Sequence, residues 1–370
     1  MTHTPTTPPR PPVATLNADA PTDEVVGRLS LLDRFLPVWI GAAMLFGIAL
    51  GRAFPGLDEA LDEVKIDTVS LPIAIGLLAM MYPVLAKVRY RSIGSVVDRR
   101  SLVMSLVLNW VVGPALMFAL AWLLLPDLPE YRTGLIIVGL ARCIAMVLIW
   151  NDLACGSREL AAVLVALNSV FQIAAYSLLG YFYLDLLPGW LGLDSEGIDV
   201  TIWEITKSVL IFLGVPLVAG FLTRLIGERR KGTQWYEDHF LPRIGPIALY
   251  GLLFTIVILF ALQGDRITDA PWDVARIAVP LVIYFAVMWT GSFAAGLRMN
   301  LSYERNTSIA FTAAGNNFEL AIAVAIGVFG VSSGQALAGV VGPLIEVPVL
   351  VALVYVALWA RRRYYPSDTV

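Results

Sequence analysis

Long apolar segments alternate with short polar connections along most of this chain. A helix needs roughly 20 apolar residues to cross the hydrocarbon core of a bilayer. Ten segments approach or exceed that length, and each is expected to be a transmembrane helix: about 38–55, 67–87, 102–125, 133–154, 160–187, 205–226, 242–263, 274–297, 306–329 and 336–360. The pattern therefore predicts an all-α integral membrane protein with ten transmembrane helices.

The composition supports a protein that lies in a lipid bilayer. Hydrophobic residues make up 58% of the chain and charged residues 15%, whereas soluble domains have about 45–50% and about 25%. The net charge of −3 gives no indication of nucleic-acid binding. The two cysteines argue against a disulfide framework, and His3 and His239 cannot form a buried metal cluster or a serine–histidine pair. We expect a protein that is not an enzyme and has no cofactor or resident metal.

The positions of lysine and arginine predict which side each connection faces. If the N-terminus is cytoplasmic, most of the 26 lysines and arginines fall in cytoplasmic segments, and the opposite loops are acidic. The start of the chain, MTHTPTTPPRPP, is rich in proline and predicts a disordered cytoplasmic tail over residues 1–35 rather than a signal peptide. We expect a multi-pass protein of the cell (plasma) membrane with both termini in the cytoplasm, the C-terminal tail being residues 361–370.

Ten helices divide into two units of five. A five-helix unit enters the membrane on one side and leaves on the other, so a second copy must be inverted. We place the units at residues 36–187 and 205–360, joined by an external linker loop over residues 188–204. Inverted repeats are typical of secondary transporters, whose discontinuous helices form a site near the bilayer midplane.

The fourth and ninth apolar segments carry matching polar clusters. The stretch RTGLIIVGLARCIAMV (132–147) aligns with RNTSIAFTAAGNNFEL (305–320), which makes Cys143 equivalent to Asn316 and Met146 equivalent to Glu319. One residue of displacement later, Gln172 aligns with Glu346. Non-helical backbone at membrane depth is tolerated where it lines a cavity or is buried in protein, so these clusters are candidates for the transport site.

The cluster in the ninth segment contains a glycine, two amides and an acid. Gly315 permits a break in the helix, and Asn316 and Asn317 favour non-helical backbone. A buried polar kink would account for the asparagines alone. A charge near the bilayer centre costs at least roughly 2.5–3.5 kcal/mol and usually marks a transport pathway, which makes Glu319 a candidate proton carrier. Glu346, the second acid, is either a proton relay or an ion-pair partner.

The cluster in the fourth segment combines a cation, a thiol, an amide and an acid. Arg142 can pair with Glu319, Glu346 or Asp152, either at the transport site or as an ion pair that only pins two helices. Asn151 and Asp152, near the cytoplasmic end of the segment, either cap the helix or line an inner vestibule. A membrane cysteine is often a small packing residue. Because Arg142 places a positive charge beside Cys143, and thiolate is a soft ligand, Cys143 is a candidate ligand for a soft metal or metalloid.

Taken together, these segments resemble the arsenical-resistance arsenite efflux permeases, which belong to the bile acid/sodium symporter superfamily. The matching stretches are GLARCIAMVLIWNDLACG, VALNSVFQ, AGNNFELAIAVAIGVFG and GPLIEVPVLV. The resemblance implies two inverted five-helix repeats, with broken helices 4 and 9 crossing near the midplane. It implies export of arsenite, sometimes antimonite, coupled to proton entry, with the essential cysteine at Cys143 and the essential acid at Glu319.

Three alternatives remain at this stage. A sodium-coupled organic-anion symporter of the bile acid type would use the acid and amides of residues 316–319 to coordinate sodium. A membrane redox protein would use the thiols of Cys143 and Cys155, although their spacing fits no redox motif. A channel would transport solute without a proton gradient.

Overall fold

The computed structural model describes residues 35–54, 56–57, 61, 63, 65–66, 69–90, 98–193, 201–269 and 271–365. Residues 1–34 of the predicted N-terminal tail lie outside the described residues, as do parts of the predicted linker loop and C-terminal tail. The regular secondary structure of the described chain is helical apart from an antiparallel pair of two-residue strands, β1 (Lys65–Ile66) and β2 (Val69–Ser70).

The helices follow the predicted apolar segments. Those before the predicted linker loop are α3 (Leu36–Ala53), α5 (Leu71–Ala86), α6 (Arg99–Val107), η2 (Leu108–Val112), α7 (Gly113–Leu124), α8 (Pro129–Leu140), α9 (Met146–Leu153), α10 (Arg158–Tyr181), η3 (Phe182–Leu186) and α11 (Leu187–Leu191). Those after it are α12 (Ile202–Val209), η4 (Leu210–Gly214), α13 (Val215–Lys231), α14 (Thr233–Trp235), η5 (Tyr236–Phe240), α15 (Leu241–Asp269), α16 (Pro271–Arg298), α17 (Tyr303–Ala314), α18 (Phe318–Phe329) and α19 (Gly334–Tyr364).

The four elements labelled η are single π-helical turns inside longer helices, and each has the same local cause. Each turn is followed by a helix whose second residue is proline: Pro114, Pro188, Pro216 and Pro242. Proline has no backbone N–H, and its ring clashes with the carbonyl of the residue four positions earlier. A π-turn widens the helix at that point, so the helix continues past the proline.

Among the described residues, six helices are long and apolar enough to cross a membrane: Arg99–Leu124, Arg158–Leu191, Ile202–Lys231, Thr233–Leu262, Ala275–Arg298 and Gly334–Tyr364. Shorter apolar helices cover Val38–Ala53, Leu71–Ala86 and Phe318–Phe329. Many large apolar side chains are exposed on these helices, for example Leu45, Leu123 and Leu178, as expected of surfaces that face lipid. The protein is therefore a multi-pass membrane protein; its division into two inverted five-helix units, and the side each terminus faces, remain predictions.

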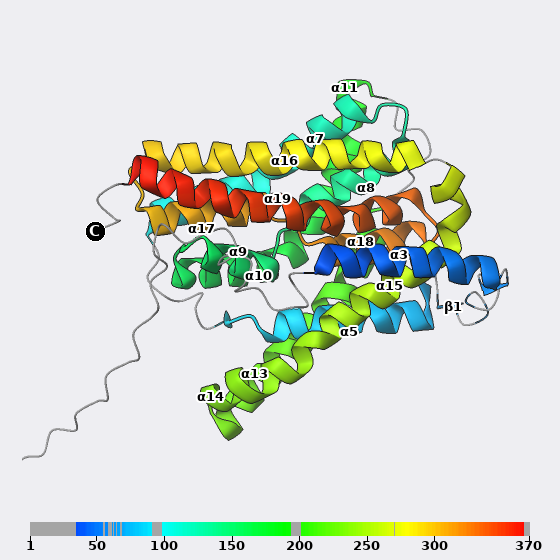
Figure 1. Cartoon of the computed structure of the whole chain (residues 1–370), viewed down its shortest axis with the longest axis horizontal. Coiled ribbons are helices and arrows are strands. Elements are labelled where there is room, and N and C mark those ends of the chain that lie inside the picture. Colours follow the sequence, from blue (N-terminus) through cyan, green and yellow to red (C-terminus); the bar gives the residue numbers. More distant parts are fainter. Residues whose placement is uncertain are drawn as a thin grey trace, which may run out of the picture.

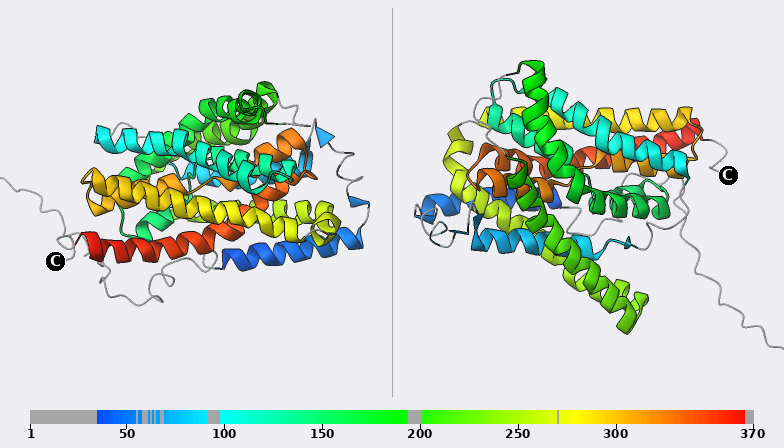
Figure 2. Two further views of the ribbon diagram at one scale, coloured as in Figure 1. Left: turned by 90° about the horizontal axis from the view of Figure 1, so that it is seen from above. Right: turned by 180° about the vertical axis from the view of Figure 1, so that it is seen from behind.

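The helices form two groups that pack against each other (Figure 1). In one group α15 packs on α3 and α5, and α13 packs on α5. In the other, α8 packs on α7, α18 and α19, while α16 packs on α17 and α19. The groups meet where α3 contacts α19 and α5 contacts α18. Figure 2 shows α13 extending away from the rest of the molecule.

Close packing inside the first group depends on small residues of α3. A Cβ atom at Gly47 would lie 2.9 Å from the Cβ of Phe260, and one at Gly51 would meet the backbone of Ala261. Small residues at such contacts let two membrane helices approach closely. The close contacts between α3 and α15 hold this group together as one unit. We therefore expect the two groups to move relative to each other.

Candidate functional site

The site is built on two interruptions of helix. Helix α8 ends at Leu140, and α9 begins at Met146 after five residues of irregular backbone. Helix α17 ends at Ala314, and α18 begins at Phe318, so Gly315, Asn316 and Asn317 lie between them. Residues 141–145 and 315–317 are called the first and second crossover segments below.

The two crossover segments contact each other through their backbones. The N–H of Cys143 donates to the carbonyl oxygen of Gly315 at 3.3 Å, and the N–H of Asn317 donates to that of Ala141 at 3.1 Å. Arg142 and Asn316 form an antiparallel bridge between these bonds. Each segment thus supplies the hydrogen-bond partners that the other lost when its helix ended, which satisfies backbone groups that water does not reach.

The pattern of these bonds corrects the sequence alignment by one residue. The reciprocal bonds make Ala141 equivalent to Gly315, and Cys143 equivalent to Asn317. Arg142, rather than Cys143, is therefore equivalent to Asn316, and the alignment that matched Cys143 to Asn316 was wrong. Only three of sixteen residues agree between the two stretches, too few to fix the register.

Each crossover segment also donates one backbone hydrogen bond to a side chain of another helix. The N–H of Arg142 donates to Oε1 of Gln172 at 2.9 Å, and the N–H of Asn316 donates to Oε1 of Glu346 at 3.4 Å. In both cases the acceptor lies 30 residues later in the chain, on α10 and on α19. The match of Gln172 with Glu346 is thus confirmed.

Arg142 is fully buried, and its guanidinium contacts neutral groups. Its Nη1 donates to the hydroxyl of Tyr284 at 2.8 Å, and its Nη2 donates to the carbonyl of Gly139. A Cβ atom at Gly113 would lie 2.6 Å from Nη1, so this glycine makes room for the guanidinium. Within the described residues, no carboxylate forms an ion pair with Arg142.

Asp152, one of the three acids considered as partners of Arg142, forms a different ion pair. Its Oδ1 accepts from Nε of Arg158 at 2.8 Å, and both side chains are exposed to water. Of the three acids considered as partners of Arg142, Asp152 is thus paired with Arg158 instead. Helix α9 begins only after the first crossover segment, and Asp152 lies near its far end, at the surface. Arg142 lies within the first crossover segment.

Cys143 lies at the centre of the crossing. Its side chain is buried, and a Cβ atom at Gly315 would lie 3.0 Å from the Cβ of Cys143 and 3.5 Å from its sulfur. Only glycine at position 315 leaves this space without a tight contact. Asn316 and Asn317 are also buried. The amide of Asn316 donates to the carbonyls of Val138 and Ala141, and Oδ1 of Asn317 accepts from the N–H of Leu320 to cap α18.

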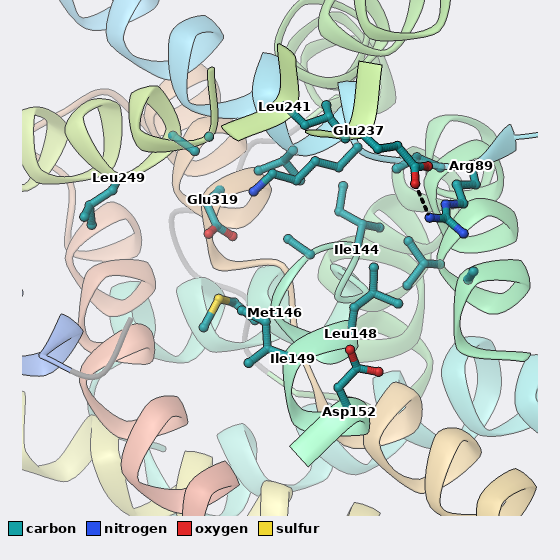
Figure 3. Close-up of a pocket in the computed structure, with 18 of the residues that line it drawn as sticks. Arg89, Ile144, Met146, Leu148, Ile149, Asp152, Glu237, Leu241, Leu249 and Glu319 are labelled. Carbon is teal, nitrogen blue, oxygen red and sulfur yellow. Dashed lines mark hydrogen bonds and ion pairs between the residues drawn. The ribbon is translucent and has the colours of Figure 1, made fainter. Parts of the chain in front are cut away.

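A cavity of about 460 Å³ opens beside the crossing (Figure 3). Ile144, Ala145 and Met146, which follow Cys143 directly, line one wall, and Glu319 lines another. Apolar residues of α5 and α15 form the facing wall, so the cavity lies between the two helix groups. Cys143 is buried and is not among the residues that line this cavity.

Comparisons with known proteins show which family the chain belongs to. Residues 74–270 match the Sodium Bile acid symporter family. The Arsenical-resistance protein Acr3 of Corynebacterium glutamicum is 58% identical over 342 residues, which cover 92% of this chain and 92% of that protein. The chain belongs to the arsenical-resistance proteins of the sodium bile acid symporter family. The Arsenical-resistance protein Acr3 of Alkaliphilus metalliredigens is 31% identical over 92% of this chain and 95% of its own, and an uncharacterized transporter of Synechocystis is 38% identical over 91% and 92%.

The family resemblance seen in the sequence is thereby confirmed, and the structure shows what surrounds the crossing in this arsenical-resistance family member. Asn151 is buried and accepts from the hydroxyl of Ser308 at 2.7 Å, while its backbone carbonyl accepts from the N–H of Gly156 at 2.8 Å. It therefore joins the end of α9 to α17 and is not part of the cavity wall. Asp152 does line the cavity, near its mouth.

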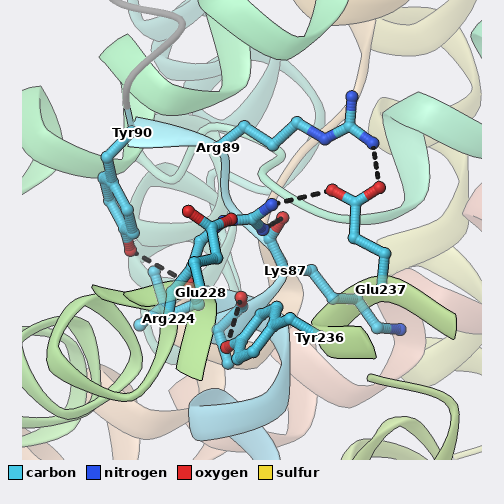
Figure 4. Close-up of polar contacts among 9 residues, drawn as sticks. Lys87, Arg89, Tyr90, Arg224, Glu228, Tyr236 and Glu237 are labelled. Carbon is cyan, nitrogen blue, oxygen red and sulfur yellow. Dashed lines mark hydrogen bonds and ion pairs between the residues drawn. The ribbon is translucent and has the colours of Figure 1, made fainter. Parts of the chain in front are cut away.

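A polar cluster from the other helix group borders the cavity (Figure 4), and Lys87, Arg89 and Glu237 of this cluster line it. Glu237 accepts from Arg89 at 2.6 Å and from Arg224 at 2.8 Å. Arg224 is buried and also donates to Glu228 and to the carbonyl of Lys87. Two ion pairs, Arg89–Glu237 and Asp152–Arg158, thus come from different helix groups and line one cavity.

Sequence reasoning missed several residues that position the site. Tyr284 and Gly113, which hold and accommodate Arg142, belong to α16 and α7 and have no local signal. Gln172 was noticed only as a match to Glu346, although its amide contacts the crossing directly. The charged cluster around Glu237 comes from three separate elements. A hydrophobicity pattern reports one helix at a time, so such contacts between distant segments escape it.

Proposed function

We propose that this protein exports arsenite from the cytoplasm in exchange for protons. The observation that supports this most is the position of Cys143. A single buried thiol lies at the crossing of two interrupted helices, and the residue after it in the chain, Ile144, lines a cavity together with Glu319. The relatives named for arsenical resistance support the choice of solute. By the same reasoning antimonite, a softer trivalent metalloid, is a second substrate.

The proposed binding step is an exchange of ligands on arsenic. Arsenous acid, As(OH)₃, reacts with the thiol of Cys143 to form one arsenic–sulfur bond, and the thiol proton leaves with one hydroxyl as water. Thiolate is a soft ligand that suits such a centre. One thiol gives specificity without holding the solute too tightly, because the reverse reaction with water releases it.

The two remaining hydroxyls need polar partners in the crossing. Oδ1 of Asn316 and Nδ2 of Asn317 are buried and have no hydrogen-bond partner among the described residues. One is an acceptor and the other a donor, so together they suit a hydroxyl that both donates and accepts. We assign these two atoms to the bound solute.

Proton coupling is assigned to the two acids near the crossing. Glu319 lines the cavity and can exchange protons with it, whereas Glu346 is buried and accepts from the backbone of Asn316. In the proposed cycle arsenite binds at Cys143 from the cytoplasm, the two helix groups move relative to each other, and Glu319 gains a proton from outside as the solute leaves. Glu346 transmits the change in protonation to the crossing through its hydrogen bond with the N–H of Asn316.

The other predicted site residues have supporting roles in this proposal. Arg142 supplies a fixed positive charge next to Cys143, held by Tyr284 rather than by an acid. Asp152 lies at the inner mouth of the cavity, and Asn151 acts on the solute only by fixing the end of α9. The cycle places the cavity mouth on the cytoplasmic side of the cell membrane.

Transport of arsenite into everted membrane vesicles tests this function. Wild type is expected to accumulate arsenite only with a proton gradient. Cys143→Ser removes the soft ligand and Glu319→Gln removes the titrating group, so each is expected to abolish accumulation. Cys155→Ser and Glu159→Gln are matched controls away from the cavity wall and are expected to behave as wild type.

The outcomes separate the competing functions. Wild-type activity in Cys143→Ser would contradict the ligand assignment, and accumulation without a proton gradient would contradict antiport. The sodium-coupled organic-anion symporter is not favoured by the relatives named for arsenical resistance. It predicts uptake that depends on sodium and does not depend on Cys143, which the same vesicles measure when sodium is added or omitted.

A further inference from the structure

The cavity wall contains a sulfur atom other than that of Cys143. Met146 is the first residue of α9 and is the one sulfur-containing side chain among the residues that line the cavity. Figure 3 shows the side chains of Met146 and Glu319 both projecting into the cavity. Cys143 itself is buried and absent from the wall, so a solute in the cavity meets the thioether before it meets the thiol.

The chemistry of a thioether differs from that of a thiol in a useful way. Methionine sulfur is polarizable and soft, but it carries no proton that could leave with a hydroxyl as water. It can therefore contact a trivalent metalloid through a lone pair without forming the covalent bond that Cys143 forms. Such a contact is reversible, which suits a position through which the solute passes.

Packing alone gives no reason for sulfur at this position. The side chains on either side of Met146 in the wall are aliphatic, and the facing wall carries Leu241, Leu249 and Leu252. Leucine has nearly the volume of methionine, and exchanges between the two are usually well tolerated. Met146 is half-buried and borders open space, so a wall of the same shape needs only leucine there.

We propose that Met146 is a specificity-determining residue that makes a soft, non-covalent contact with the trivalent metalloid in the cavity and favours antimonite over arsenite. The inference rests on the proposed function, because it assigns a further contact to the same solute. Antimony(III) is larger and more polarizable than arsenic(III), so its contact with the thioether is the stronger of the two.

Met146→Leu tests this contact because it removes the sulfur and retains the volume. Initial rates of arsenite and antimonite uptake are measured in everted vesicles over a range of concentrations. The variant is expected to raise KM for antimonite about fivefold, to raise KM for arsenite less, and to leave the maximal rates near those of wild type. Met81→Leu, the same substitution at a buried position outside the cavity wall, is expected to change neither KM.

Selenomethionine labelling provides a second arm. Selenium is softer than sulfur, so labelled wild type is expected to have a lower KM for antimonite, and labelled Met146→Leu is expected to show no such decrease. The label replaces all nine methionines, and the variant isolates the effect of position 146. If Met146→Leu does not reach the membrane, Met146→Ile, which also removes the sulfur, takes its place in both arms.

The outcomes distinguish this inference from the function on which it rests. Arsenite uptake by wild type together with an unchanged ratio of the two KM values in Met146→Leu would overturn the inference and leave the proposed function intact. An unchanged antimonite KM in the labelled wild type would also overturn it. Failure of wild type to transport either metalloid would overturn the proposed function and the inference together.

Discussion

The two crossover segments have the same backbone contacts and different side chains. Each is held by a reciprocal bond to the other segment and by an amide or acid 30 residues later. The first segment carries Arg142 and Cys143 and is held by Gln172, which cannot titrate. The second carries Asn316 and Asn317 and is held by Glu346, which can. One symmetric scaffold thus presents a soft ligand with a fixed charge on one side, and neutral amides with titrating acids on the other.

In the proposed function, solute binding and proton binding are assigned to residues that are far apart in the sequence and lie at one place in the structure. Cys143 lies in the first segment, whereas Glu319 follows the second by two residues. The crossing brings the segments together, so a change in the hydrogen bonds of either one moves the other. We infer that this mechanical link couples the two events in the proposed exchange of arsenite for protons.

The first test makes the side chain that accepts from the second crossover segment neutral, as Gln172 already is for the first. Glu346→Gln keeps an oxygen that can accept from the N–H of Asn316 and removes the titrating group. We expect the thermal midpoint in detergent to stay within a few degrees of wild type, because the bond is preserved. Arsenite uptake driven by a proton gradient is expected to fall by at least about tenfold, a modest value for loss of a group that transfers protons.

Glu304→Gln serves as the control for that experiment, since Glu304 is exposed at the start of α17. It is expected to retain both the thermal midpoint and the uptake of wild type. Full proton-driven uptake by Glu346→Gln would show that the difference between Gln172 and Glu346 has no part in coupling.

A second test removes side-chain bonds that only the second segment makes. Asn316→Ala removes the two hydrogen bonds from its amide to the carbonyls of Val138 and Ala141, and a hydrogen bond of this kind contributes about 0.5–1.5 kcal/mol. Asn317→Ala removes the cap of α18, which costs about 1 kcal/mol. We expect both to lower the thermal midpoint, Asn316→Ala more so. The reverse order would contradict the assignment of Asn316 as the side chain that joins the two segments.

A third test exchanges the small residues at equivalent positions of the two segments. Gly315→Ala places a methyl group 3.0 Å from the Cβ of Cys143, and overpacking of this kind costs about 1–3 kcal/mol. Because the thiol must shift, we expect a higher KM for arsenite. Ala141→Gly creates no contact and is expected to have the smaller effect on KM, measured in the same vesicles. Equal KM values would indicate that the space beside the thiol is not needed.

The smallest expected effect concerns the connection that leads into the first segment. Asp127, between α7 and α8, accepts from Arg276 of α16, and this hydrogen bond lowers the pKa of Asp127 to about 2. A carboxyl group with a lowered pKa contributes stability above its unfolded-state pKa, and this stability is lost as the pH falls through about 2. Asp127→Asn is therefore expected to lower the thermal midpoint slightly at pH 7. The difference should shrink between about pH 4 and pH 2; a difference that grows on acidification would contradict this role.

Part of this architecture was predictable from the sequence. The positions of the helices followed from the apolar segments, because the length needed to cross a bilayer is fixed. The break in the second segment followed from Gly315 and the two asparagines after it, since these residues favour non-helical backbone. Glu319 was noticed because acids are rare at that depth.

The rest depended on contacts between distant segments. Ala141, Cys143 and Ala145 are all compatible with a continuous helix, so nothing local predicts the break in the first segment. It exists because the second segment supplies the hydrogen bonds that a helix would otherwise make. The neutral partner of Arg142 could not be predicted either, because Tyr284 lies 142 residues away in the chain and an acid is the commoner expectation for a buried arginine.

The most direct test of the central claim is the X-ray absorption spectrum, at the arsenic edge, of arsenite bound to the purified protein. Wild type is expected to show one short arsenic–sulfur bond and two arsenic–oxygen bonds, and Cys155→Ser is expected to show the same. Cys143→Ser should show no short arsenic–sulfur bond. Three oxygens and no short arsenic–sulfur bond in the wild-type spectrum, or a short arsenic–sulfur bond that persists in Cys143→Ser, would contradict the claim that the thiol at the crossing is the ligand.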